Sequence, residues 1–505
     1  MNPTIDRRGT YAVAAAFAAL LVIVAAPLFS TVLPPLVDYP NHLARLHLIA
    51  EGGNRFYQVR WAPLPDLAAD LVVPGLVAGV GLPLALAGKL FLAMIFGLIA
   101  GGAAWLNRAA TGRWRMWPLL AFLLLYSRVF LWGFINYLFG LGVALCGIAL
   151  WLALEERRGP RVLASIVVAL ACFFSHIAAF GVYAVAIAGV ELVPVLGLLR
   201  SRRFGDIVGR IAAAAAQFVL PAIILWRFEP ASPDQPIGYG AIWRKADLLF
   251  SVFDDYSRPF DVVCFVLFVG LLGALAWKRR LEIAPRLGTA LALLLVVYLL
   301  SPTRIFTGYG ADHRLPIALF LMFVAATSPV PPLSRRAALL VGVAVAAIFA
   351  ARMAVVEAIW LKSDAVYTDD LRVLGGFPLG AKIAVGFPPR DINAGGIPQL
   401  HVPVLAVERD AFVPTLFAFP TQQPLLVRPP YDRIALQTSP SALWAAFVED
   451  DAAARAQIAP ILGDYDFILL ADRERFVVPP RPCLRRMPST PSFQVFALSH
   501  DQGCF

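Results

Sequence analysis

The sequence predicts a polytopic α-helical membrane protein with a small α/β domain at its C-terminal end. Of the 505 residues, 59% are hydrophobic and only 15% are charged, and many apolar runs approach or exceed the roughly 20 residues needed to cross a bilayer. After residue 360, prolines become frequent and short β-prone runs replace the long apolar ones. We therefore expect a transmembrane domain over residues 1–360 and a soluble domain over residues 361–505.

The apolar runs predict about eleven crossings. We place them at residues 11–34, 83–106, 116–127, 131–154, 162–176, 178–199, 207–227, 261–277, 287–301, 315–330 and 337–360. The runs at 116–127 and 162–176 are short for full spans. The stretch 66–81 is apolar but is interrupted by Pro74 and Gly75, so we expect an interfacial or re-entrant helix there.

The distribution of arginine and lysine predicts how the chain is oriented. Basic residues gather in the short turns after every second crossing, for example Arg200, Arg202 and Arg203, and are sparser in the longer loops between them. This pattern places the N-terminus in the cytoplasm and the C-terminal domain on the outer face. The arginine- and alanine-rich composition suggests a bacterial source, so we expect a bacterial inner membrane with this domain in the periplasm. The net charge of +10 follows from these turns, so we do not interpret it as a nucleic-acid surface. The first apolar run lacks a small-residue cleavage site and is interpreted as a retained anchor.

The soluble domain is expected to contain short strands and one clear helix. The β-prone runs lie at residues 382–387, 402–407, 425–427, 466–470 and 493–498. A helix is predicted over 441–451, because Ser439 and Pro440 form a start signal before it.

The cysteines predict a disulfide in this domain. Cys483 and Cys504 both fall in the part assigned to the periplasm, which is an oxidising compartment, so we expect them to pair. The alternative is two unpaired thiols. No CxxC or Cys/His spacing typical of a metal site occurs in the sequence, which leaves any metal unknown.

A polar stretch directly after the first apolar run carries the first candidate site. Asp38, His42 and Arg45 arrive together where a hydrocarbon span ends. A proline at position 40 and glycines at 52 and 53 predict a short helix over residues 40–51, on which His42 and Arg45 share a face with Asp38. Asp38 would then sit at the lip of a site facing the lipid surface. The alternative is an ordinary interfacial helix whose polar face contacts water or headgroups.

Other ionisable residues lie at the same predicted face of the membrane. They are Arg128, His176, Arg304, Asp312, His313 and Arg314. Charged groups near lipid are costly and usually face a cavity or a partner. Two arginines and a histidine suit a phosphate or pyrophosphate held at headgroup level, and the alternative is a salt-bridged loop end. His176 is either a hydrogen-bonded packing residue or a ligand contact.

Two adjacent acids in a predicted outer loop are open to two interpretations. Asp254 and Asp255 could bind a divalent cation, Mg or Mn, or form a solvated turn.

The layout and three local pieces resemble the GT-C superfamily of integral-membrane glycosyltransferases. The pieces are Asp38-Tyr39-Pro40-Asn41-His42-Leu43-Ala44-Arg45, Gly133-Phe134-Ile135-Asn136-Tyr137 and Asp312-His313-Arg314-Leu315-Pro316. The resemblance implies an inverting transfer of sugar from a polyprenyl-phosphate donor to a lipid or glycan acceptor. It implies that Asp38 is the catalytic base. Many members carry two adjacent acids where this chain has Asp38 and Tyr39.

The same resemblance implies roles for the basic residues. Arg304 and Arg314, assisted by His313, would stabilise the charge that develops on the leaving phosphate. His42 and Arg45 would orient Asp38 or touch the donor.

Two other classes of function fit parts of the pattern. A transporter or flippase for a lipid-linked saccharide would use the same cavity without chemistry, and a structural membrane protein would use the soluble domain for docking. Transporters often carry internal repeats and polar residues near the bilayer midplane. We see no repeat, and the polar groups cluster at one predicted surface, which favours the enzyme.

Overall fold

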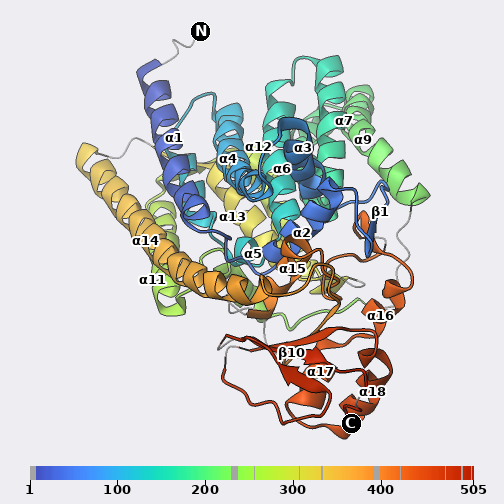
Figure 1. Cartoon of the computed structure of the whole chain (residues 1–505). Coiled ribbons are helices and arrows are strands. Elements are labelled where there is room, and N and C mark those ends of the chain that lie inside the picture. The colour runs from blue at the N-terminus through green and yellow to red at the C-terminus, as the bar shows by residue number, and fades with distance from the viewer. Residues whose placement is uncertain are drawn as a thin grey trace. The chain divides into compact units, whose positions relative to one another are not determined.

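The computed structural model describes the chain apart from a few short segments (Figure 1). The described residues are 7–228, 237–254, 256–305, 308–330, 334–389, 398–420, 422–472, 474–490, 493–501 and 503–505.

The described residues contain eight helices that are long and apolar enough to cross a membrane. They are α1 (Arg7–Ser30), α4 (Leu84–Thr111), α6 (Ile135–Ala153), α7 (Arg158–Ser175), α8 (Ile177–Arg200), α9 (Phe204–Arg227), α11 (Arg258–Trp277) and α14 (Arg335–Leu374). Each coincides with one of the expected crossings. The prediction of a polytopic helical membrane protein is confirmed.

The other three expected crossings form shorter apolar elements. They are η1 (Trp117–Leu124), a 3₁₀ helix, α12 (Pro285–Leu300) and α13 (Leu315–Ala326). Helix α13 ends at Ala326 because the chain then enters β5 (Thr327–Pro329), which pairs with β2 (Leu281–Ile283). The stretch expected to be an interfacial or re-entrant helix is α3 (Ala68–Val80), with Pro74 inside it.

The chain divides into two compact units. Unit 1 comprises Met1–Pro27, Pro63–Ala68 and Leu90–Glu357, and unit 2 comprises Leu28–Ala62, Ala69–Lys89 and Ala358–Phe505. Unit 2 therefore joins the C-terminal part of the chain to two segments from near its start.

Unit 1 is a bundle in which α6, α7 and α9 lie side by side (Figure 1). Helices α8 and α12 approach closely at Gly189, where Ala290 leaves no room for a side chain, and the hydroxyl of Thr289 donates to the Gly189 carbonyl at 2.7 Å. Charged pairs also connect elements of the bundle: Arg161 binds Glu191 at 3.0 Å, and Arg286 binds Glu155 at 2.6 Å.

Unit 2 is built on a four-stranded mixed sheet of order β6-β8-β10-β9. The strands are β6 (Ile383–Gly386), β8 (Phe467–Ala471), β9 (Leu484–Arg486) and β10 (Phe493–Leu498). Strands β6 and β8 are parallel, whereas β10 is antiparallel to both of its neighbours. Helices α16 (Tyr431–Gln437), α17 (Pro440–Phe447) and α18 (Ala452–Leu462) complete this part, and α17 begins as predicted, with Ser439 as its N-cap.

One predicted strand is wrong. Residues 402–407 form the end of η3 (Pro398–Val404) and most of α15 (Leu405–Glu408). Pro403 lies within the run and has no N–H to give to a strand ladder, which disfavours a strand there.

The N-terminal segment of unit 2 shares its core with the C-terminal part. Strand β1 (Tyr57–Val59) pairs antiparallel with β7 (Leu425–Val427). The Tyr57 hydroxyl donates to the Val413 carbonyl and accepts from its N–H, both at 3.0 Å. Phe56 and Tyr57 lie in one buried cluster with Phe412, so the segment after α1 is an integral part of this unit.

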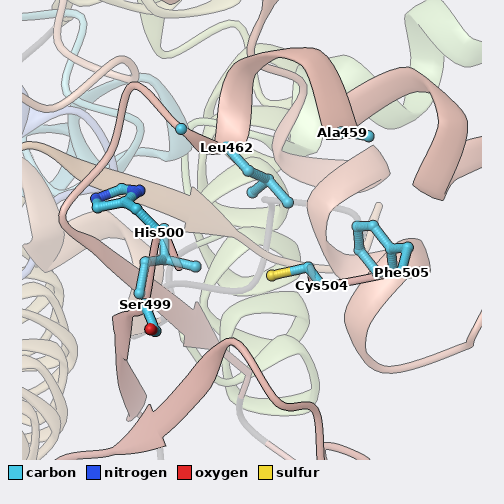
Figure 2. Close-up of a pocket in the computed structure, with 8 residues that line it drawn as sticks. Ala459, Leu462, Ser499, His500, Cys504 and Phe505 are labelled. Carbon is cyan, nitrogen blue, oxygen red and sulfur yellow. The ribbon is translucent and has the colours of Figure 1, made fainter. Parts of the chain in front are cut away.

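The predicted disulfide joins Cys483 and Cys504, whose Cα atoms are 5.0 Å apart. A cavity of about 200 Å³ lies beside it, between the end of α18 and the C-terminal residues. Figure 2 shows Ser499 and His500 toward one end of this cavity and Phe505 toward the other.

Candidate functional site

The candidate residues fall into two groups according to unit. Asp38, His42, Arg45, Cys483 and Cys504 belong to unit 2. Arg128, His176, Arg304, Asp312, His313 and Arg314 belong to unit 1.

In unit 1, two short paired strands precede the Asp312–Arg314 turn. Strands β3 (Arg304–Ile305) and β4 (Gly308–Tyr309) pair antiparallel, and η2 (Asp312–Arg314) follows immediately before α13. The N–H of Gly310 donates to the Thr303 carbonyl at 2.9 Å, with Gly310 at φ +74°, a conformation that glycine adopts readily. The Thr303 hydroxyl donates to Asp312 Oδ2 at 2.9 Å. This hydrogen bond ties Asp312 to the residue that directly precedes β3.

Lys245 is not among the predicted site residues, although it lies in the polar loop between the seventh and eighth expected crossings. It lies on α10 (Arg244–Phe250), and its ammonium group donates to Asp312 Oδ2 at 2.8 Å and to the Ser301 carbonyl at 2.7 Å and hydroxyl at 3.1 Å. Both Lys245 and Asp312 are buried. The three acceptors use all three donors of the ammonium group, so Lys245 acts here through charge and by fixing Asp312.

Two arginines lie in the same charged region. Arg128 opens α5 (Arg128–Leu131) and forms an ion pair with Asp254. Arg314 donates through Nη1 to the carbonyls of Tyr309, at 2.9 Å, and Gly310, at 2.7 Å. Its guanidinium carbon lies 4.1 Å from the centre of the Phe134 ring. These contacts fix the guanidinium planes in place.

His313 lies between aromatic rings and among the charges. Its ring centroid is 4.9 Å from that of Trp132 and 5.4 Å from that of Tyr309. Burial lowers the pKa of His313, the Asp312 carboxylate opposes this by raising it, and the cations Arg128, Arg314 and Lys245 lower it further. The net result is a lowered pKa, so the imidazole is neutral at pH 7.

We call Arg128, Lys245, His313 and Arg314 the cationic cluster. With His313 neutral, its three cations face the carboxylates Asp254 and Asp312, which leaves one positive charge in excess. Within the described residues, the buried nitrogens around it that make no hydrogen bond include His313 Nδ1 and Trp132 Nε1. Buried polar atoms in proteins are normally paired. The arrangement is therefore suited to an anionic, hydrogen-bonding ligand.

Arg304 and His176 differ from the cluster residues. The Arg304 side chain is exposed, and Arg304 is not among the charges that shift the pKa of His313. His176 caps α8, because its Nδ1 accepts from the N–H of Ala178 at 3.0 Å, and its ring lies 5.7 Å from that of Tyr137. These two contacts fit the first of the two alternatives for His176, a hydrogen-bonded packing residue.

In unit 2, Asp38 directly precedes α2 (Tyr39–Ala50) and is partly buried. Its carbonyl accepts from the N–H of His42 at 2.9 Å, and its carboxylate does not cap the helix.

The expected polar face of α2 is mostly buried. Arg45 is fully buried and bound by Asp70 of α3 through two hydrogen bonds, Nε to Oδ1 at 2.8 Å and Nη2 to Oδ2 at 3.0 Å. The His42 ring, 8% exposed, lies 5.6 Å from Phe417. Asn41 binds the same loop, with its amide donating to the Thr415 carbonyl at 2.8 Å. Asp70 and Asn41 were not selected from the sequence.

Among the described residues, no group of three or more His, Cys, Asp or Glu side chains is placed to hold a metal ion. Asp254, one of the two acids considered for a divalent cation, pairs with Arg128 instead. Asp255 lies outside the described residues.

The long apolar helices and the small mixed sheet define a multi-pass helical membrane protein with a C-terminal α/β unit. No protein-family model and no curated protein matches the chain.

Two solved structures are similar to it. One is ArnT from Cupriavidus metallidurans bound to undecaprenyl phosphate, at 15% identity and a TM-score of 0.48, with 96% of this chain and 98% of that one covered. The other is the arabinofuranosyltransferase AftD from Mycobacteria, at 16% identity and a TM-score of 0.49, with 97% of this chain and 40% of that one covered.

Proposed function

We propose that the protein is an inverting membrane glycosyltransferase of the GT-C type. It would move a sugar from a polyprenyl-phosphate donor to a lipid or glycan acceptor at the periplasmic face of a bacterial inner membrane. The observation that supports this most strongly is the cationic cluster, in which three cations and a neutral imidazole surround buried polar atoms that lack partners. Guanidinium groups and imidazole N–H groups are donors suited to phosphate oxygens.

The cluster would stabilise the leaving group. As the bond between the anomeric carbon and the phosphate oxygen breaks, its electron pair passes to the phosphate, and negative charge grows on the phosphate oxygens. Arg128 and Arg314 would bind that charge directly, and His313 would donate one N–H. Fixed donors of this kind stabilise developing charge without having to reorganise. Phosphate leaves readily as an anion, so this step requires no strong general acid.

Asp38 would act as the general base. Its carboxylate would take the proton from the acceptor hydroxyl as that oxygen attacks the anomeric carbon. The new bond would form on the face opposite the leaving phosphate, which inverts the configuration of the sugar. The partly buried position of Asp38 at the start of α2 supports this role.

The binding step can be tested with purified protein and a polyprenyl monophosphate. We expect Arg128→Gln and Arg314→Gln each to weaken binding by about 10- to 100-fold, since a hydrogen bond to a charged group contributes about 1.5–3 kcal/mol. Arg258→Gln is the matched control, because Arg258 pairs with Asp247 at the exposed surface, at 3.1 Å. Equal affinity for the polyprenyl monophosphate in all three variants would show that the cationic cluster does not bind the phosphate.

The rival function is a transporter or flippase for a lipid-linked saccharide. Reconstituted vesicles with donor and acceptor separate the two: the enzyme joins sugar to acceptor, whereas a flippase moves the donor across the bilayer without changing it.

A further inference from the structure

An apolar groove runs between the first two long helices of unit 1. Its volume is about 320 Å³, and it is lined by Thr10, Val13, Ala14 and Phe17 of α1, Gly101 and Ala104 of α4, and Trp114. The α1 residues are spaced three and four apart and therefore share one face of that helix. Small side chains on both helices leave the space open.

The groove has the length and position of part of one acyl chain. From Thr10 to Phe17 it follows α1 for about 10 Å, at 1.5 Å per residue. Both helices are long enough to cross a membrane, and one leaflet of the hydrocarbon region is about 15 Å thick. Thr10 lies three residues after the first residue of α1, Arg7. The groove therefore runs from the polar boundary into the same leaflet.

Arginines surround the polar end of this groove. The Arg108 guanidinium carbon lies 5.0 Å from the centre of the Trp114 ring, which is itself a lining residue. The exposed Arg7 and Arg8 begin α1, and Arg113 and Arg115 flank Trp114. In the part of the chain that the structure describes, none of these arginines forms an ion pair with a carboxylate. Their charge is therefore available to an external anion.

We propose that this groove binds an anionic phospholipid, with one acyl chain against α1 and α4 and the phosphate on the arginines. The apolar lining accounts for the chain, and the unneutralised arginines account for the anionic headgroup. Tryptophan at the polar boundary is the residue that favours the headgroup level. The proposal rests on unit 1 alone and does not depend on the proposed glycosyl transfer.

Native mass spectrometry of the full chain in detergent tests the proposal, with phosphatidylglycerol and phosphatidylcholine of identical acyl chains as probes. We expect the wild type to bind phosphatidylglycerol more tightly than phosphatidylcholine. Replacing Arg108, Arg113 and Arg115 by glutamine should weaken phosphatidylglycerol binding by about fivefold per arginine and leave phosphatidylcholine binding unchanged. These side chains lie at the surface or partly exposed, so the variant should fold.

A second pair of variants tests the groove itself. Ala14→Leu places a larger side chain in the groove from an exposed position and should reduce the binding of both lipids. Ala15→Leu adds the same side chain at an exposed position of α1 outside the lining and should change neither. Equal binding of the two lipids by the wild type, or an Ala14→Leu variant that binds like the wild type, would overturn the proposal. A wild-type dimer lost in Ala14→Leu would also overturn it, since a second copy would then fill the groove.

Discussion

Replacing Lys245 by methionine should destabilise the protein strongly. The ammonium group of Lys245 lies 2.8 Å from Asp312 Oδ2, and both residues are buried, at 6% and 1% exposed. Methionine keeps the length and apolar character of the side chain but leaves the carboxylate with the Thr303 hydroxyl as its hydrogen-bond donor. Breaking a buried ion pair from one side costs about 3–5 kcal/mol, so we expect a loss of that size in the free energy of unfolding.

A double-mutant cycle separates this charge effect from lost packing. Lys245→Met combined with Asp312→Asn removes both charges, and it should recover most of the stability lost in Lys245→Met alone. The exposed pair of Arg258 and Asp247 is the control, with side chains 64% and 52% exposed. Arg258→Met should cost about 1 kcal/mol or less.

Unfolding in mixed micelles, followed by tryptophan fluorescence, measures all four proteins against the wild type. A cost for Lys245→Met no larger than that for Arg258→Met would refute the buried pair. The buried pair would also be refuted if the double variant lost as much free energy of unfolding as the two single variants together.

Three further predictions follow from other contacts. Arg45→Ala should cost about 3–5 kcal/mol in the same unfolding assay, because it leaves the Asp70 carboxylate buried without its partner, and a loss under 1 kcal/mol would contradict this. Because the pKa of His313 is lowered, the unfolded chain binds a proton more readily than the folded one, so stability should fall as the pH drops below about 6.5. The His313→Asn variant should lose less stability between pH 7 and pH 5. Identical pH profiles for the variant and the wild type would contradict the lowered pKa of His313. Replacing Cys483 and Cys504 together by serine should cost on the order of 3 kcal/mol, since the bond joins residues 21 apart in sequence, and a reducing agent should destabilise the wild type but not this variant.

Hydropathy was sufficient to predict most of the fold. A long apolar run must be a helix in a bilayer, because its backbone groups can then pair only with one another, so eight of the expected crossings coincide with long helices. Residues 116–127 and 315–330 are equally apolar, but they form the buried η1 and α13. Apolar composition does not distinguish burial in protein from exposure to lipid.

The charged pairs depend on contacts that no local pattern contains. Lys245 and Asp312 are 67 residues apart, and Arg45 and Asp70 are 25 apart on different helices. The sequence indicated which residue types gather in these segments. It could not show that Asp70 binds Arg45 or that Lys245 fixes Asp312, because each pairing is made by tertiary packing.

The initial rate of sugar transfer from a polyprenyl-phosphate donor, measured for Asp38→Asn beside the wild type in one reconstituted system, tests the central claim most directly. Asparagine preserves the size of the side chain but cannot accept the hydroxyl proton, and general-base catalysis typically contributes 10²–10⁴-fold. We predict a rate at least about 100-fold lower, with the affinity for polyprenyl monophosphate unchanged. A variant that transfers sugar at the wild-type rate would contradict the role of Asp38.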